Sequence, residues 1–271
     1  MPYHYPLPPV VGIEVYKNDV VVVRAPGRSN SVENTRSEVK EFSRASRQRL
    51  AFIAANSDVV FTSLCTLTYP REFPNDGARV KRDLQTFLKA LRRKVPALEF
   101  LWFLEFQRRG APHVHVLIRG ARVHKPMQRW VSETWYRICG TGDARHLRAG
   151  TRLERVRKPN GARNYAVKYA HKMRQKCVPE GYRNVGRFWG CTKSVRPVVR
   201  GSFACTNDDL IGALEAGGWD RMNGDAVRFK TLYGASAALT RWVNGSILEL
   251  STSKQKGAIR RTTQKEGQNG H

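Results

Sequence analysis

Apolar and polar positions along the chain follow two periods, and these periods predict its elements. Period-two runs predict strands, and repeats at helical spacing predict amphipathic helices. From residue 58 the expected order is strand, helix, strand, strand, helix, strand, helix, over Val59–Tyr69, Arg79–Val95, Phe100–Gln107, His113–Ile118, Lys125–Ile138, Thr151–Arg157 and Asn160–Lys176. This order predicts an α+β domain, an antiparallel sheet with helices packed on one face, of the ferredoxin-like, split βαβ kind that RRM-like folds share.

Residues 1–57 are expected to form structure that is accessory to the main domain. Val10–Ala25 is expected to form two short strands around a Lys17-Asn18-Asp19 turn. From about Asn30 to Asn56 the pattern predicts a basic helix, whose arginines face either phosphates or solvent.

Charge changes sharply near residue 200. From Arg108 to Arg200 there are 23 Lys or Arg against four Asp or Glu, but from Gly201 to Leu250 there are four against six. We therefore expect the main domain to cover residues 58–200, followed by a small module over 201–250 and a basic, disordered tail over 251–271.

Composition narrows the choice of partner. The net charge of +26 over 271 residues indicates a polyanionic partner, either nucleic acid or an anionic membrane surface. No apolar run approaches the ~18 residues of a membrane span and no signal-like segment follows the N-terminus, so the expected protein is cytoplasmic and has no membrane partner. The five cysteines are widely spaced without a C-x-x-C, which argues against a disulfide framework and a zinc knuckle.

The first candidate site is His113-Val114-His115-Val116. Its alternation predicts a strand on which both imidazoles leave the same face. Two neighbouring histidines are often surface or core residues, and that reading stays open. If they do form a site, Thr66 and Thr68 of the central strand are candidates to face it.

A hairpin would add a carboxylate to these histidines. If the chain folds symmetrically about Gly110, Glu105 lies opposite His115 and Gln107 lies opposite His113, all on the histidine face. Two imidazole nitrogens and a carboxylate oxygen, without a thiolate, suit Mg²⁺ or Mn²⁺ acting as a Lewis acid.

The second candidate site is the helix that contains Asn164–Lys172. Tyr165 and Tyr169 are four residues apart, and Lys168 and Lys172 each follow a tyrosine by three residues, so a helix places all four on nearly one face. A phenol needs a nearby cation to become a good nucleophile at neutral pH, and the lysines could supply it. The alternative is an amphipathic helix with tyrosines inward and lysines outward.

Together these motifs resemble the HUH endonucleases, specifically the rolling-circle replication initiator proteins of small phages and plasmids. The resemblance rests on three motifs in the family's order: Thr66-Leu67-Thr68-Tyr69-Pro70, His113-Val114-His115, and the Y-x-x-K-Y-x-x-K segment Tyr165–Lys172. Gly186-Arg187-Phe188-Trp189-Gly190 also resembles a segment that follows the tyrosine helix in the filamentous-phage branch. The order of motifs argues against a conjugative relaxase, where the tyrosine comes early.

The resemblance implies a nickase for single-stranded origin DNA. Its tyrosine would form a 5′-phosphotyrosyl link and release a 3′-OH for polymerase. His113 and His115 would be metal ligands, with Glu105 as the third and Gln107 as the fallback. Tyr169 ranks first as the nucleophile, because family members with one nucleophile keep the corresponding tyrosine, and Tyr165 would serve the second transfer.

No G-x-x-x-x-G-K-[ST] is present, so a fused P-loop helicase is not expected and a host helicase would unwind the DNA.

Two other functions compete with the interpretation as a replication initiator. An HUH-type transposase would use the same chemistry on element ends. A non-catalytic single-stranded nucleic-acid-binding protein would explain the charge but not the coincidence of motifs.

Overall fold

The computed structural model divides the chain into two units. One is Asn34–Arg196, and the other combines Met1–Glu33 with Pro197–His271. The residues that the structure describes are 10–23, 39, 41–157, 178–206, 208–210, 212, 231–232, 248–249 and 260–261. The predicted tyrosine helix, and most of the predicted module and tail after residue 206, lie outside them.

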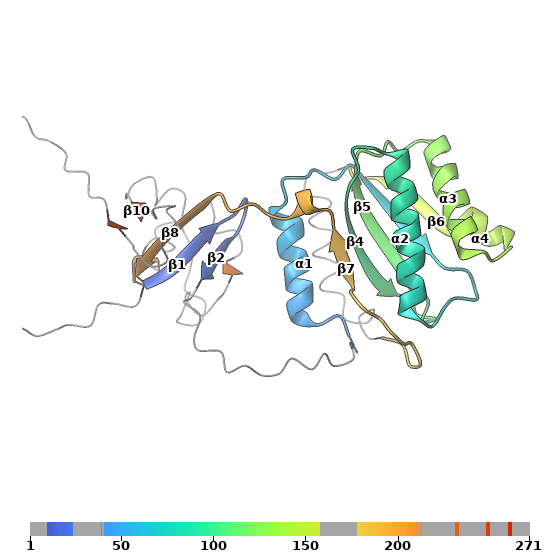
Figure 1. Cartoon of the computed structure of the whole chain (residues 1–271), viewed down its shortest axis with the longest axis horizontal. Coiled ribbons are helices and arrows are strands. Elements are labelled where there is room, and N and C mark those ends of the chain that lie inside the picture. The colour runs from blue at the N-terminus through green and yellow to red at the C-terminus, as the bar shows by residue number, and fades with distance from the viewer. Residues whose placement is uncertain are drawn as a thin grey trace, which may run out of the picture. The chain divides into compact units, whose positions relative to one another are not determined.

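The larger unit contains a mixed set of helices and strands (Figure 1). In chain order they are α1 (Arg44–Asn56), β3 (Ser63–Thr68), α2 (Gly77–Lys94), β4 (Glu99–Phe106), β5 (Pro112–Arg119), α3 (Lys125–Cys139), α4 (Ala144–Ala149), β6 (Thr151–Arg155), β7 (Trp189–Cys191) and the 3₁₀ helix η2 (Lys193–Val195). The six predicted elements from Val59 to Arg157 are all present, with bounds that differ by a few residues. No helix among the described residues is long and apolar enough to cross a membrane.

The sheet has the order β6-β3-β5-β4-β7, and every neighbouring pair is antiparallel. Its first four strands, with α2 between β3 and β4 and α3 between β5 and β6, have the split βαβ arrangement. The α+β prediction with an antiparallel sheet is therefore confirmed.

Helices α2 and α3 cover one face of this sheet. The ammonium of Lys81 on α2 lies 5.5 Å from the ring of Trp102 on β4, and Phe87 on α2 contacts Trp135 on α3 edge to face. Because side chains alternate along a strand, this is the face of Val114 and Val116, both buried in the core. His113 and His115 therefore leave the opposite face.

In the larger unit, helix α1 differs from its prediction, and α4, β7 and η2 were not predicted. Helix α1 begins at Arg44 because Ser43 caps it, accepting from the Ser46 N–H at 3.3 Å, and Glu41 to Ser43 are not helical. The short strand β7, beside β4, and the short helix α4 were missed because three to six residues carry no clear period.

The smaller unit joins both ends of the chain. The predicted hairpin is confirmed as β1 (Val10–Val15) and β2 (Val20–Val23), which pair antiparallel. Strand β8 (Gly201–Thr206) pairs with β1, and the sheet order is β8-β1-β2-β9, with β9 at Thr231–Leu232. A second pair joins β10 (Leu248–Glu249) and β11 (Arg260–Arg261).

These units differ from the predicted segments. The prediction grouped α1 with the N-terminal hairpin in residues 1–57, whereas the structure places it in the larger unit, where Leu50 and Phe42 pack into the main core. It also separated residues 201–250 from the N-terminus, whereas β8 pairs with β1. The functional boundary near residue 200 remains a prediction.

Candidate active site

Three adjacent strands place a polar cluster on the sheet face opposite α2 and α3. Thr66 lies opposite His115, and Thr68 lies opposite His113. The Thr66 hydroxyl is 3.3 Å from His115 Nδ1, and the Thr68 hydroxyl is 2.9 Å from His113 Nδ1. The expectation that both threonines face the histidines is confirmed.

Glu105 joins this cluster from β4. Its Oε2 lies 3.3 Å from His115 Nε2, and both side chains are buried. The two imidazole rings are 4.5 Å apart and nearly perpendicular, and the Phe103 ring stacks on His115 at 5.0 Å. The predicted trio of His113, His115 and Glu105 therefore shares one face of the sheet.

The predicted hairpin register is wrong by two residues. Glu105 lies opposite His113, and Phe103 lies opposite His115. The cause is Gly110, which has φ of 81° and ends the loop Arg108–Gly110 instead of lying at its centre. Because the error is an even number, Glu105 stays on the histidine face and meets His115 diagonally.

Gln107, the predicted fallback ligand, does not lie opposite His113. Its N–H donates to the Ala111 carbonyl at 2.9 Å, so it closes the hairpin loop. Its Oε1 accepts from Arg109 Nε at 2.9 Å. The corrected register thus places Gln107 in the turn, and Glu105 is the acidic residue beside the histidines.

Arg109 links the hairpin turn to the end of β3 through hydrogen bonds. Its guanidinium donates to the carbonyls of Tyr69 at 2.6 Å and Pro70 at 2.5 Å, and it lies 5.1 Å from the Phe73 ring. The sequence patterns did not single out Arg109. Its role here is to hold the two strands that carry Thr68 and His113.

The chemistry of the cluster suits a divalent cation, although its geometry is incomplete. Threonine hydroxyls contact both Nδ1 atoms, so the Nε2 atoms are the candidates for ligation. Two ligands at right angles, with bonds of about 2.1 Å, lie about 3 Å apart, close to the separation of His115 Nε2 and Glu105 Oε2. Within the described residues, however, no group of three or more His, Cys, Asp or Glu is arranged as a metal site.

The main-chain carbonyl of Thr68 is held from the helical side. Trp135 Nε1 donates to it at 2.9 Å, and His146 Nε2 lies 2.9 Å from the same oxygen. Both side chains are buried. The sequence patterns did not single out His146, because nothing local in the sequence indicates a contact with a residue 78 positions away.

Two described tyrosines near this strand end are poor nucleophiles. Burial, together with the Asp83 carboxylate, raises the pKa of Tyr69 far above its usual range, and its hydroxyl donates to Asp83 at 2.9 Å. Burial likewise raises the pKa of Tyr182. Both phenols therefore stay protonated at neutral pH.

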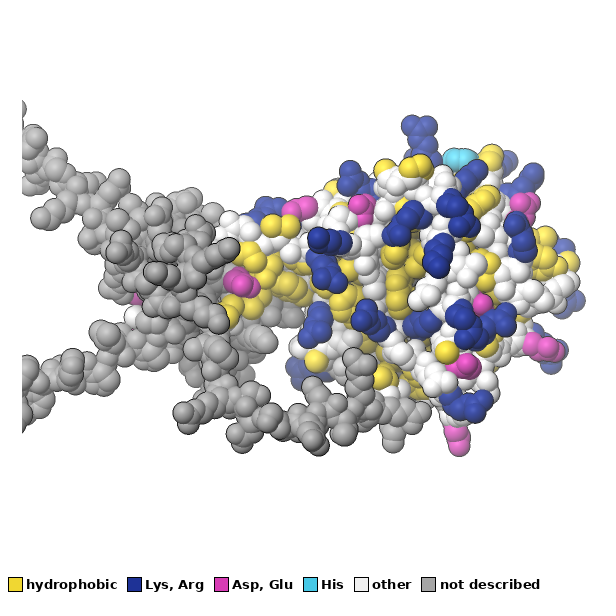
Figure 2. Space-filling model, viewed as in Figure 1, with side chains coloured by type: hydrophobic (Ala, Val, Ile, Leu, Met, Phe, Trp, Pro, Cys, Tyr) yellow, Lys and Arg dark blue, Asp and Glu magenta, His cyan; other side chains and the backbone are white. Residues whose placement is uncertain are grey.

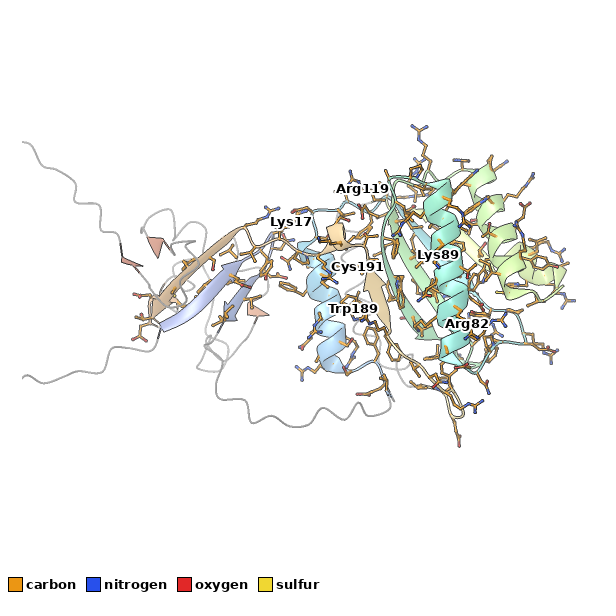
Figure 3. The ribbon with its side chains drawn as sticks, in the orientation of Figure 1. Lys17, Arg82, Lys89, Arg119, Trp189 and Cys191 are labelled. Atoms are coloured by element: carbon orange, nitrogen blue, oxygen red, sulfur yellow. The ribbon has the colours of Figure 1, made fainter. Side chains whose placement is uncertain are left out.

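The predicted nucleophile and its cations lie outside the described residues. They are Tyr165, Lys168, Tyr169 and Lys172. Their roles therefore stay predictions. The segment after them is described: Leu104 N–H donates to the Phe188 carbonyl at 2.7 Å, and Trp189 Nε1 donates to Ser46 Oγ at 3.0 Å (Figure 3 labels Trp189).

Comparison with known proteins gives one informative match. Residues 62–174 match the family model for the replication-associated protein ORF2/G2P, and this segment contains all three motifs. No curated protein is similar enough to count as a relative. Among solved structures, the N-terminal nuclease domain of non-structural protein 1 of minute virus of mice aligns with 69% of this chain and 73% of its own, at 16% identity. Its TM-score is 0.18, so it carries no argument here. Residues 62–174, which carry the three motifs, are thus similar to the replication-associated proteins of the ORF2/G2P family, in agreement with the resemblance that the motifs indicated.

Proposed function

We propose that this protein is a replication initiator that nicks single-stranded origin DNA by tyrosine transesterification and starts rolling-circle replication. The observation that carries the proposal is the cluster of Thr66, Thr68, His113, His115 and Glu105 on one sheet face. The family match adds a replication role. A host helicase and a DNA polymerase would then continue from the nick.

In the proposed reaction the Tyr169 hydroxyl oxygen attacks the scissile phosphorus. A bond forms between that oxygen and phosphorus, and the bond from phosphorus to the 3′ oxygen breaks. The phenol loses its proton and the 3′ oxygen gains one, so the products are a 5′-phosphotyrosyl link and a free 3′-OH. Lys168 and Lys172 stabilise the phenolate and the charge on the phosphate oxygens.

The second tyrosine completes the cycle. Tyr165, one helical turn away, attacks the regenerated origin junction in the same manner and releases the 3′-OH of the displaced strand. That second 3′-OH then displaces Tyr169 from the 5′ end of the same strand, which closes a single-stranded circle and leaves Tyr165 linked to the new 5′ end. Each exchange conserves the number of phosphodiester bonds, so no external energy source is needed.

The histidine cluster would hold Mg²⁺ or Mn²⁺ through His113, His115 and Glu105. When bound, the cation supplies positive charge that polarises the scissile phosphate. The chain's own contribution is orientation, because the threonine contacts fix both imidazole rings and Phe103 packs against His115. Glu105, buried beside His115, brings the negative charge that favours a cation there.

The same cluster would serve an HUH-type transposase, whose chemistry is identical and whose DNA differs. A non-catalytic single-stranded nucleic-acid-binding protein would not need buried Glu105 and His115 on a sheet face. The family match to a replication-associated protein favours the initiator over both.

A histidine variant separates catalysis from binding. We expect His113→Ala with His115→Ala to lower cleavage of an origin oligonucleotide by at least about 100-fold, because ground-state affinity rests mainly on Lys and Arg contacts to phosphates. Single-stranded DNA binding, measured across a salt series without divalent metal, should change less than about threefold. Equal losses of binding and cleavage would show that the cluster is only structural.

A further inference from the structure

The outward surface of α2 is basic along its whole length. On a helix, Arg82, Lys89 and Arg93 fall within about 40° of one line, diametrically opposite the buried residues Val80 and Leu91. All three are exposed. Figure 2 shows Lys and Arg gathered over this helix, and Figure 3 labels Arg82 and Lys89 on it.

This basic line lies away from the candidate active site. Helix α2 covers the sheet face of Val114 and Trp102, whereas His113, His115 and Glu105 leave the other face. The sheet and its core therefore separate the α2 charges from any strand held at the histidine cluster. The charges of α2 would serve a different segment of ligand.

Acidic neighbours offset the charge of the line at one end, where Arg82 interacts electrostatically with Asp76. Among described residues, the ion pair that α2 makes is Arg79 with its own Asp83, which is buried. Asp76 also caps the N-terminus of the helix, and Glu99, at the start of β4, accepts hydrogen bonds from Ser194 and Thr192. Like charges at helical spacing repel one another, so the line costs stability unless an anion binds it.

The basic surface continues beyond α2. The other exposed members belong to the turn after β5 and to the start of α3, and they are Arg122, Lys125 and Arg129. We call Arg82, Lys89 and Arg93, together with these three, the α2 surface.

We propose that the α2 surface binds the backbone of duplex DNA, independently of sequence, on the side of the domain opposite the nicking site. Duplex DNA carries one negative charge per about 1.7 Å of its axis, the densest anion this surface is expected to meet. Arg82 and Arg93 are about 17 Å apart along the helix axis, which with their long side chains spans a major groove of about 12 Å.

The residue types of α2 favour duplex DNA as the ligand over single-stranded DNA and anionic membranes. Single strands are held by exposed aromatic rings that stack on bases, but the aromatic residue of α2, Phe87, is fully buried. An anionic membrane favours a helix that can insert its apolar face, and the apolar face of α2 is part of the core. Helix α2 therefore offers a ligand only contacts to phosphate groups, and such contacts suit the backbone of duplex DNA.

The test compares two triple variants of the full-length chain. The first is Arg82→Gln, Lys89→Gln and Arg93→Gln on the α2 surface. The matched control is Arg137→Gln, Arg145→Gln and Arg148→Gln, which removes the same charge from exposed positions on α3 and α4. Circular dichroism and a thermal melt confirm that both are folded.

Binding is measured with a 20-base-pair duplex unrelated to any origin, a single-stranded dT oligonucleotide and anionic phospholipid vesicles. For the first triple we expect duplex affinity to fall on the order of 100-fold at about 0.1 M salt, with the salt slope reduced by about 2 to 3. The control should lose less than about threefold. Cleavage of a single-stranded origin oligonucleotide by the first triple should continue at a similar rate.

Three results would overturn the proposal. Equal losses in both triples would mean that only net charge matters. A loss confined to the dT oligonucleotide or to the vesicles would assign the surface to that ligand. Undiminished duplex binding in the first triple would move the duplex site elsewhere. Because the duplex measurement needs no cleavage, absence of nicking by the unaltered protein would reject the proposed function and leave this test intact.

Discussion

At the scale of single residues, the Thr68 carbonyl connects the helical layer to the histidine cluster. Trp135 and His146 both contact this oxygen, and the Thr68 hydroxyl contacts His113 on the other side of the sheet. The end of β3 is therefore held on both faces. Removing a contact to the Thr68 carbonyl on the helical side should therefore affect the position of His113.

Replacing Trp135 by Phe tests this connection. The ring still packs, but the carbonyl loses its indole donor, so we expect the free energy of unfolding to fall by about 1–3 kcal/mol. Mn²⁺ affinity, measured by calorimetric titration, should fall about 3- to 10-fold. The matched control is Trp130→Phe on the same helix, because its indole makes no hydrogen bond to the described residues. Equal effects of both changes would assign them to packing.

The residue scale also shows how far sequence reasoning could go. Alternation placed His113 and His115 on one face, because the parity of a strand is local information, and the hairpin assumption added Glu105 to that face. The pairing itself depended on which residue of the loop takes positive φ, and symmetry about Gly110 was the wrong guess. The contacts of Arg109 and His146 depend on tertiary structure, so the sequence could not predict them.

At the scale of elements, the start of α2 is pressed against the segment that leads to β7. Gly77 N–H donates to the Arg183 carbonyl at 2.8 Å, and Lys81 Nζ donates to the Val185 carbonyl at 3.1 Å. A Cβ on Gly77 would lie 2.2 Å from the Asn184 carbonyl oxygen. Gly77 is therefore required by backbone proximity.

Gly77→Ala should destabilise the larger unit by about 1–3 kcal/mol, because the clash is with backbone that cannot rotate away. Chemical denaturation with a fluorescence readout measures this. Gly212→Ala is the control, since a Cβ there meets nothing within 4 Å. A Gly77→Ala protein as stable as the control would mean that the segment around Asn184 does not pack against α2 as described.

Elements with long apolar periods could be predicted from the sequence. Short elements, and strands that form only through pairing with a neighbour, could not. Helix α2 and strands β3 to β5 lie close to their predicted bounds because their apolar patterns are long. Strand β7 has three residues, and only its position beside β4 makes it a strand. Helix α1 starts where Ser43 caps it, a choice that competing polar residues nearby obscured.

At the scale of the whole molecule, the chain is divided by contacts that are distant in sequence. The pairing of β1 with β8 joins residues 10–15 to residues 201–206 in one unit. Local patterns could show the hairpin but not its partner. The charge step near residue 200 nevertheless lies close to the division at Arg196.

This division predicts how the chain can be shortened. A fragment over residues 34–200 should fold and cleave an origin oligonucleotide, since it keeps α1 and the candidate site. The fragment 58–200 loses Phe42 and Leu50 from the core and should be less stable by about 3 kcal/mol or more. Thermal melts and cleavage assays measure both. If the folded longer fragment is inactive while the full chain cleaves, the nicking machinery needs the smaller unit.

The central claim is that Tyr169 becomes covalently linked to DNA, and mapping that link tests it most directly. The protein is incubated with a labelled single-stranded origin oligonucleotide and Mn²⁺, separated by denaturing electrophoresis and digested with trypsin for mass spectrometry. We expect a 5′-phosphotyrosyl peptide at Tyr169, no first adduct in Tyr169→Phe, and an intact first adduct in Tyr165→Phe. An adduct found only on Tyr165 would reverse the roles of the two tyrosines, and an undiminished adduct in the double Phe variant would contradict the account.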